Sequence, residues 1–243
     1  MTNSAFESIA HARFYQFEKS HTNQFISFLY NERQRRILNM IASEVKKNSR
    51  SCFVLDIGCG SGYFSGVLSL QFTTVGLDAD RKEMNLDVQR KFKKLNFILA
   101  DMRFMPFKSY SIDIIVCISV LEHCKDLEDQ IRKIKDVLKK DAVFIAGYPI
   151  ETKFFKSVWK RVSPLSFMFI DCERAYSQPY WRNPSTGKLE CYWESFHTHK
   201  QTYQKIRKVL GKNFKILHKE KLPFDILPDS LTYYECVKMR NVI

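Results

Sequence analysis

Short hydrophobic runs alternate with amphipathic segments through the middle of the chain, from about residue 52 to residue 148. Runs rich in Val, Ile, Leu and Phe predict buried strands, and apolar residues at three- and four-residue spacing predict helices. The pattern predicts strands at 52–57, 73–78, 95–99, 112–118 and 142–148, and helices at 63–70, 81–90 and 127–138. This alternation indicates crossover units and a parallel sheet covered on both faces.

The segments on either side of this region have a different pattern. Apolar residues between Thr22 and Lys47 recur at helical spacing and predict one or two amphipathic helices. Residues 149–200 hold four prolines and many aromatic residues, so this segment is too long for a connection and too aromatic for a disordered linker. After it, the pattern predicts a helix at 201–210 and two strands, at 214–221 and 231–238.

The most informative motif is a strand that runs directly into a glycine-rich turn, with glycines at positions 58, 60 and 62. Glycines let the chain reverse tightly and let backbone N–H groups approach a ligand. A dinucleotide-binding turn has the spacing G-x-G-x-x-G and holds a pyrophosphate. Here the spacing is G-x-G-x-G, and Asp56 stands two positions before the first glycine. A carboxylate there opposes a pyrophosphate but suits the ammonium group of an amino acid.

This turn resembles motif I of the class I S-adenosylmethionine-dependent methyltransferases, and three further motifs follow in the order of that family. Asp78 ends the second predicted strand, Asp101 follows the third, and Ser119-Val120-Leu121-Glu122-His123 follows the fourth, as in the small-molecule (type 11-like) members. The resemblance implies S-adenosyl-L-methionine as cofactor, with its ribose on Asp78 and its adenine amino group on Asp101. The cofactor-binding residues that it implies are Asp56, Gly58, Cys59, Gly60, Gly62, Asp78, Ala79, Asp101, Met102, Ser119 and Val120.

We therefore expect an α/β fold with a Rossmann-like seven-stranded sheet, mostly parallel and completed by a C-terminal antiparallel hairpin. Residues 1–243 are expected to form a single methyltransferase domain. Its expected parts are an N-terminal helical cap at 1–50, a cofactor-binding core at 51–148, a lid insertion at 149–200, and a C-terminal helix and β-hairpin at 201–243.

The composition of the chain limits the cellular compartments and the classes of partner to be expected. The chain has no apolar run long enough to span a bilayer and no N-terminal signal core, and its seven scattered cysteines form no C-x-x-C pair. We therefore expect a cytoplasmic protein. The formal net charge of +13 raises the question of a polyanionic partner. The basic residues recur on many amphipathic segments, with no aromatic and basic recognition module, so we do not expect nucleic acid as the partner.

Methyl transfer from a sulfonium requires alignment of the reacting groups, and a hydroxyl acceptor also needs a general base. His123 and His199 are the candidate bases, His123 at the end of the fourth strand and His199 at the end of the predicted lid. Glu122 and His123 have an alternative role in fixing the loop. Related quinone-pathway O-methyltransferases carry a Glu-x-x-Glu-His cluster that can hold a cation, but Ser119 replaces the first Glu here, so no metal site is predicted.

Three functions remain open. The first is methyl transfer to a small-molecule acceptor. The second is methylation of RNA or protein, although the Asn-Pro-Pro-Tyr type signature is absent after the fourth strand. The third is a member that binds cofactor without transfer. Aromatic and basic residues interleave in the predicted lid and favour an amphipathic, lipid-linked or anionic acceptor, or a membrane surface that delivers it; alternatively, these rings pack the lid onto the fold.

Overall fold

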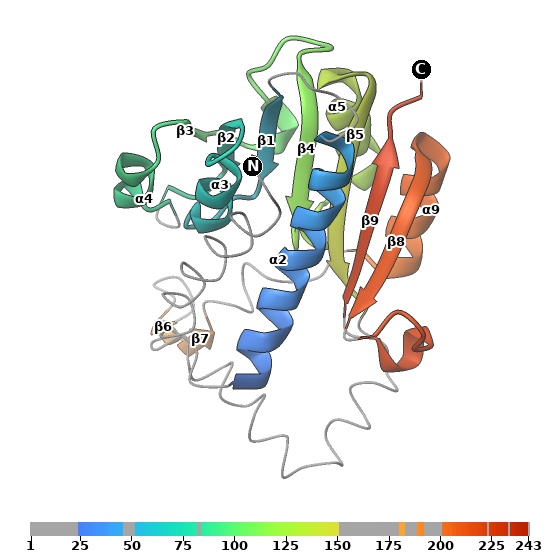
Figure 1. The fold of residues 1–243 in the computed structure, drawn as a ribbon. Helices are drawn as coiled ribbons and strands as arrows, with labels where there is room; N and C mark the ends of the chain where they lie inside the picture. Colours follow the sequence, from blue (N-terminus) through green and yellow to red (C-terminus); the bar gives the residue numbers. More distant parts are fainter. Residues whose placement is uncertain are drawn as a thin grey trace.

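The computed structural model describes residues 24–45, 52–81, 84–150, 180–182, 189–191, 201–222, 224–232 and 234–242. Within these residues, seven strands form one sheet in the order β3-β2-β1-β4-β5-β9-β8 (Figure 1). The strands of this sheet are β1 (Phe53–Ile57), β2 (Thr73–Asp78), β3 (Leu95–Leu99), β4 (Ile112–Ile118), β5 (Leu138–Pro149), β8 (Lys215–Leu222) and β9 (Tyr234–Arg240).

The first five strands pair in parallel, and β9 is antiparallel to both β5 and β8. This confirms the predicted α/β, Rossmann-like sheet with its C-terminal antiparallel hairpin. The strand order reverses between β1 and β4, since the chain moves outward from β1 to β3 and then returns to β4 on the other side of β1. In open α/β sheets a ligand binds at the carboxyl ends of the strands beside such a switch point.

Helices cover both faces of the sheet (Figure 1). The helices are α2 (Gln24–Val45), α3 (Tyr63–Leu68), α4 (Leu86–Lys91), α5 (Leu127–Val137) and α9 (Tyr203–Asn213), with short 3-10 turns η1 (Met102–Phe104), η2 (Leu121–His123) and η3 (Asp229–Leu231). Neighbouring residues of β4 point to opposite faces of the sheet. Ile115 packs with α5 and α9, whereas Ile114 packs with α2 and α3. A strand buried on both faces needs an unbroken apolar run, and this is the pattern that the sequence shows.

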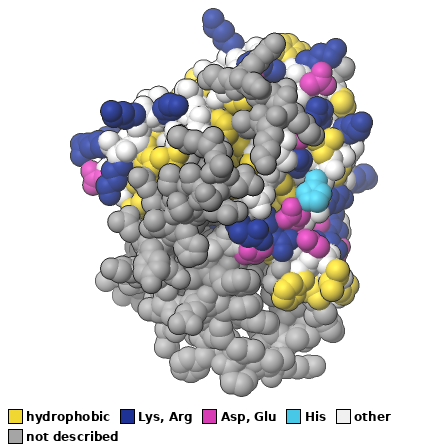
Figure 2. All heavy atoms as spheres, viewed as in Figure 1, with side chains coloured by type: hydrophobic (Ala, Val, Ile, Leu, Met, Phe, Trp, Pro, Cys, Tyr) yellow, Lys and Arg dark blue, Asp and Glu magenta, His cyan; other side chains and the backbone are white. Residues whose placement is uncertain are grey.

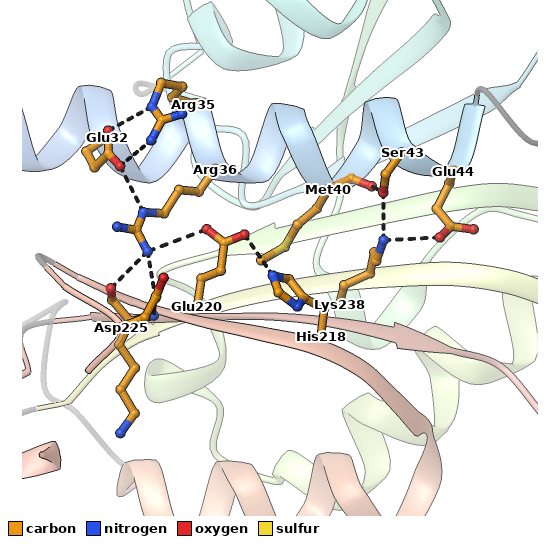
Figure 3. A network of polar contacts seen from close by, with 11 residues as sticks. Glu32, Arg35, Arg36, Met40, Ser43, Glu44, His218, Glu220, Asp225 and Lys238 are labelled. Carbon is orange, nitrogen blue, oxygen red and sulfur yellow. Dashed lines mark hydrogen bonds and ion pairs between the residues drawn. The ribbon is translucent and has the colours of Figure 1, made fainter. Parts of the chain in front are cut away.

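Helix α2 is anchored to the C-terminal strands by polar contacts (Figure 3). Arg36 lies 2.7 Å from the carboxylate of Asp225 and 2.9 Å from that of Glu32, and it donates a 3.0 Å hydrogen bond to the carbonyl of Lys221. At the other end of the helix, Lys238 of β9 lies 3.1 Å from the carboxylate of Glu44. These contacts fix the position of α2 over the sheet.

Three elements begin three or more residues away from their predicted start. Helix α4 begins at Leu86, and not at residue 81, because the Asn85 side chain caps it by accepting the backbone N–H of Asp87. Strand β5 begins at Leu138, where the preceding helix passes directly into the strand. Strand β9 begins at Tyr234, because η3 occupies the three residues from Asp229. The N-cap of α5 is Asp126, whose side chain accepts the N–H of Asp129.

Most of the predicted lid lies outside the described residues. Its described part is an antiparallel pair, β6 (Tyr180–Arg182) and β7 (Leu189–Cys191), which forms a sheet of its own. None of the described helices is long and apolar enough to cross a membrane. On the face drawn in Figure 2, the described Lys and Arg side chains lie at several separate places, along the upper and right margins and also nearer the centre beside acidic side chains.

Candidate active site

The glycine turn joins β1 to α3 at the carboxyl edge of the sheet. All three of its glycines have positive φ, which is 71° at Gly58, 50° at Gly60 and 77° at Gly62. The turn is fastened to the neighbouring strand, because the backbone N–H groups of Gly58 and Cys59 donate to the carbonyl of Leu77 at 2.7 and 3.1 Å. The turn therefore has the left-handed backbone that glycine adopts without steric cost.

The three glycines have different surroundings. A Cβ on Gly58 would overlap Val120, and a Cβ on Gly62 would overlap the ring of Phe97. At Gly60, by contrast, no heavy atom of the described residues lies within 4 Å of the position that a Cβ would take. Gly58 and Gly62 thus serve packing, whereas Gly60 leaves an approach to the backbone from outside.

This difference predicts distinct effects of alanine at Gly62 and Gly60. Gly62→Ala should lower the free energy of unfolding by at least about 2 kcal/mol, since it combines a strained φ with overlap on Phe97. Gly60→Ala should cost only about 1 kcal/mol of backbone strain, but it should weaken cofactor binding by blocking the approach. Urea unfolding and calorimetric titration with S-adenosylhomocysteine measure the two effects. Wild-type affinity in Gly60→Ala would contradict the assignment of Gly60 to the ligand side.

Asp78 organises the turn from the end of β2. One carboxylate oxygen accepts the backbone N–H of Gly60 at 2.8 Å, and the other accepts the N–H of Asp80 at 2.9 Å. Each carboxylate oxygen has a second lone pair, so this geometry leaves acceptor capacity for hydroxyl groups. Asp78 is therefore both a support for the turn and a group suited to ribose hydroxyls.

Asp56 lies beneath the turn and does not line an open surface. Its side chain is 3% exposed and accepts the hydroxyl of Ser65, on α3, at 2.6 Å. Burial raises the pKa of Asp56 to about 7; the hydrogen bond from Ser65 opposes this, and the nearby charge of Asp78 adds to it. Contact with an ammonium group would favour the ionised carboxylate, which burial disfavours.

Asp101 stands at the tip of β3, next to Asp78. The backbone N–H of Ala100 donates to the carbonyl of Asp78 at 2.9 Å, which ties the two tips together. The Asp101 side chain accepts the backbone N–H of Arg103 and two of its guanidinium nitrogens, at 2.7 and 3.0 Å. These contacts hold the pKa of Asp101 below its usual range, so it is an ionised acceptor. An adenine amino group would share this carboxylate with Arg103.

The end of β4 faces the turn from the other side of the switch point. Val120 lies against Gly58, since a Cβ on that glycine would overlap it. Ser119 has a φ of 56°, which is rare for a residue with a side chain. Its hydroxyl lies 2.8 Å from the hydroxyl of Tyr234 and accepts a 3.2 Å hydrogen bond from Arg33. Strained backbone of this kind is often found at functional sites.

Glu122 and His123 follow in η2. Glu122 is buried, with 3% of its side chain exposed, and its carboxylate lies 4.0 Å from Nε2 of His123. The side chain of His123 is 24% exposed. The backbone carbonyl of Glu122 accepts the backbone N–H of Gln201 at 3.0 Å. This hydrogen bond joins η2 to the residues just before α9. The described residues hold no group of three or more His, Cys, Asp or Glu side chains that suits a metal ion.

The other predicted site residues differ in their surroundings. Ala79 is exposed at the edge of the turn. Cys59 is half-buried, and burial keeps the pKa of its thiol above the usual range, so it is a neutral neighbour. Met102 packs into the core, where the thiol of Cys124 contacts its sulfur at 3.9 Å. His199 lies outside the described residues.

Four residues of the site were missed by the sequence interpretation. Arg103 could have been found, since an Asp followed two positions later by Arg fits a local ion pair. Ser65 carried a weaker signal as a hydroxyl within an apolar helix. Arg33 and Tyr234 gave no local signal, because they reach Ser119 from positions 86 and 115 residues away.

The arrangement fits the implied cofactor. Asp78, at the tip of β2, lies between the glycine turn after β1, with its open approach at Gly60, and Asp101 at the tip of β3. Such a set can hold an amino-acid moiety, ribose hydroxyls and an exocyclic amino group. No cluster of basic side chains for a pyrophosphate accompanies the turn among its described contacts.

Comparison with known proteins agrees with this site. Residues 55–146 match the family described as the methyltransferase domain. An uncharacterized protein of Methanocaldococcus jannaschii is 31% identical over 183 residues, which cover 68% of this chain and 75% of that protein. A ubiquinone biosynthesis O-methyltransferase of Rickettsia prowazekii is 25% identical over 104 residues, 41% of each chain. The human arginine-hydroxylase NDUFAF5 is 34% identical over 94 residues, which cover 38% of this chain and 27% of that protein.

The fold has solved counterparts. The magnesium protoporphyrin IX methyltransferase of Synechocystis, crystallised with bound SAH, superposes with a TM-score of 0.57 and 18% identity over 98% of this chain and 96% of its own. The sheet order, the turn at the switch point and the relatives lead to one conclusion. The chain belongs to the class I S-adenosylmethionine-dependent methyltransferase family, and its cofactor is S-adenosyl-L-methionine.

Proposed function

We propose that the protein transfers the methyl group of S-adenosyl-L-methionine to a small-molecule acceptor in the cytoplasm. The observation that carries this proposal is the division of the site into two sides. Asp78, Asp101 and the glycine turn, at the ends of β2, β3 and β1, would provide the cofactor contacts. Ser119, which the resemblance counts among the cofactor-binding residues, meets Tyr234 and Arg33 beside the turn, and we assign this side to the acceptor.

The cofactor supplies a methyl group that is already activated on a sulfonium sulfur. The residues of the chain bind and orient the cofactor and the acceptor, and they exclude water from the site. Asp78 and Asp101 would hold the ribose and adenine, and the turn would hold the methionine part. Val120, packed on Gly58, closes the turn from the acceptor side. Fixing donor and acceptor in line is the main contribution that such a site makes to the rate.

Proton removal from a hydroxyl acceptor requires a base within hydrogen-bond reach. His123 is our first candidate, because the buried carboxylate of Glu122 beside it would stabilise the protonated ring. His199 is the second candidate. A neutral amine acceptor attacks through the free lone pair of its nitrogen and needs no base for that step, so the dependence of turnover on His123 reports whether the acceptor must lose a proton.

We also propose that residues 149–200 form a lid. The acceptor that we propose is amphipathic or lipid-linked and is presented by a membrane surface. Their support is the aromatic and basic composition of that segment. Methylation of RNA or protein has less support, because the Asn-Pro-Pro-Tyr type signature is absent after β4, where Ser119-Val120-Leu121-Glu122 stands.

A transfer assay with labelled cofactor tests the function. The full-length protein is incubated with a panel of phenols, carboxylic acids, amines and lipid-linked alcohols, alongside total RNA and unfolded protein. We expect label in an extractable small molecule or lipid, and no label when His123→Ala is combined with a hydroxyl acceptor. Label confined to the RNA or protein fraction would overturn the proposed acceptor class, and cofactor binding without transfer to any class would indicate a non-catalytic member.

A further inference from the structure

The loop that follows β8 holds two strongly exposed apolar side chains. Phe224 is 61% exposed and Ile226 is 93% exposed. Single exposed apolar side chains are common on protein surfaces, but two on one short loop indicate a contact with another molecule. The loop lies between β8 and η3, at the lower right of Figure 1, and apolar side chains gather at the same place in Figure 2. We call residues 224–227 the apolar tip.

The apolar tip has a defined backbone. The N–H of Leu227 donates to the carbonyl of Phe224 at 3.2 Å, which closes a turn. The side chain of Asp225 accepts the backbone N–H of Lys221 at 2.6 Å and lies 2.7 Å from Arg36 of α2 (Figure 3). The carboxylate within the tip is therefore held by the protein, whereas the apolar side chains on either side of it face solvent.

The apolar tip lies at the same edge of the sheet as the glycine turn. Strand β8 is antiparallel to β9, and β9 is antiparallel to β5, so β8 runs in the direction of the five parallel strands. Its last residue, Leu222, therefore stands at their carboxyl edge. Four strand spacings separate β8 from β1 in the sheet, a distance of about 19 Å. A surface that the tip enters would thus lie beside the edge at which the cofactor binds.

The carboxylates near the apolar tip are neutralised by basic side chains. Residues 201–242 contain nine Lys and Arg but only four Asp and Glu, so this part of the chain is basic. Each of the four carboxylates has a basic partner: Asp225 and Glu220 contact Arg36, Glu235 contacts Arg207, and Asp229 contacts Arg207 and Lys221. No unpaired carboxylate of this part of the chain would repel an anionic surface.

Two exposed lysines supply unpaired positive charge. Lys208 and Lys219 have no ion pair among the described residues. Lys208 follows Arg207 on α9, and Arg207 contacts Asp229, just beyond the tip. Lys219 precedes the end of β8 by three residues, about 10 Å along the strand. This distance is close to the range over which a charged surface acts at physiological ionic strength.

We propose that the apolar tip, with Lys208 and Lys219, binds the surface of an anionic lipid bilayer. This inference rests on the proposed function, because it names the surface through which the protein reaches a lipid-linked acceptor. Phe224 and Ile226 enter the boundary between headgroups and acyl chains, and the two lysines contact anionic headgroups. A stable protein partner would bury about 800 Å² on each side, which is more than two side chains supply. Acyl chains, in contrast, adapt to protruding side chains of any shape.

Co-sedimentation with vesicles tests this surface. The full-length protein is mixed with vesicles of phosphatidylcholine, or of an equal mixture of phosphatidylcholine and phosphatidylglycerol. We expect tighter binding to the mixed vesicles, and weaker binding as the salt concentration rises. Phe224→Ser combined with Ile226→Ser should lower the partition coefficient on the mixed vesicles at least about tenfold. Because both side chains are exposed, the thermal midpoint of this variant should equal that of the wild type.

Two further variants make the result specific. Val242→Ser is the matched control, because Val242 is 46% exposed and follows the end of β9, at the opposite edge of the sheet. It should bind vesicles as the wild type does. Lys208→Ala combined with Lys219→Ala should weaken binding to the mixed vesicles about tenfold and leave binding to phosphatidylcholine unchanged.

Four outcomes overturn the inference. They are no binding of the wild type to the mixed vesicles, equal binding to both kinds of vesicle, equal binding of the wild type and the tip variant, and a dimer in sedimentation velocity that the tip variant loses. The last of these would make a second copy of the chain the partner. The transfer assay with soluble acceptors separates this failure from failure of the proposed function. Label in a soluble acceptor together with any of the four outcomes would leave methyl transfer standing and remove only the bilayer.

Discussion

Replacing Asp78 with alanine is expected to weaken the binding of S-adenosyl-L-methionine at least about tenfold. The ribose loses hydrogen bonds to a charged acceptor, each of roughly 1.5 to 3 kcal/mol. The turn also loses the 2.8 Å bond from the N–H of Gly60, so the backbone that faces the ligand becomes less ordered. Calorimetric titration of the purified variant measures this affinity directly.

Two further variants make the result specific. Asp78→Asn keeps the size of the side chain and one carbonyl acceptor, so its affinity should lie between those of the wild type and Asp78→Ala. Asp87→Ala changes a carboxylate on α4 that is 71% exposed and paired with Arg90, and it should bind as the wild type does. Unchanged affinity in Asp78→Ala would place the ribose elsewhere and remove this residue from the site.

Asp56→Asn is expected to stabilise the protein without cofactor at pH 8 and to leave its stability nearly unchanged at pH 4. The folded pKa of Asp56 is raised from 3.8 to about 7 by burial, so the folded state holds a proton that the unfolded state has released between these values. The free energy of unfolding of the wild type therefore falls as the pH rises through this window. The shift corresponds to at most about 4 kcal/mol, and asparagine can still accept the hydrogen bond from Ser65.

With cofactor bound at pH 8, the wild type should be more stable than Asp56→Asn. The reason is that an ammonium group near Asp56 would stabilise the ionised carboxylate, which asparagine lacks. Thermal unfolding of both proteins from pH 4 to pH 8, with and without S-adenosylhomocysteine, measures this. The difference between the two proteins isolates Asp56, since other titrating groups contribute equally to both. A constant difference across this pH range would show that Asp56 has no raised pKa, and equal cofactor affinity would remove it from the amino-group site.

The parallel core was predictable because its signal is local. A strand buried on both faces is a continuous apolar run, and β2, β3 and β4 have the predicted bounds. The polar residues that cap or end helices and strands were harder to predict. The cap at Asn85 was not recognised, and the helix that follows it was predicted to begin five residues too early.

The cofactor side of the site was predictable for a related reason. Its residues follow strand ends within a few positions, so Asp78 and Asp101 are marked by the strands that precede them. The acceptor side depends on how α2 and β9 are placed against β4. That placement is set by tertiary contacts such as those of Arg36 and Lys238, which no local pattern records. Arg33 and Tyr234 therefore emerge only from the assembled fold.

The position of β9 has a consequence for how the protein assembles. This strand follows β8 in the chain but is inserted between β8 and β5. Strand β8 therefore has no partner in the sheet until β9 has formed, and β5 keeps an unpaired edge until the same moment. Such pairing across a long stretch of chain is slow compared with local contacts. Because Tyr234 is the first residue of β9, this late step of folding also completes the acceptor side, so a partly folded chain can present the glycine turn before it can select an acceptor.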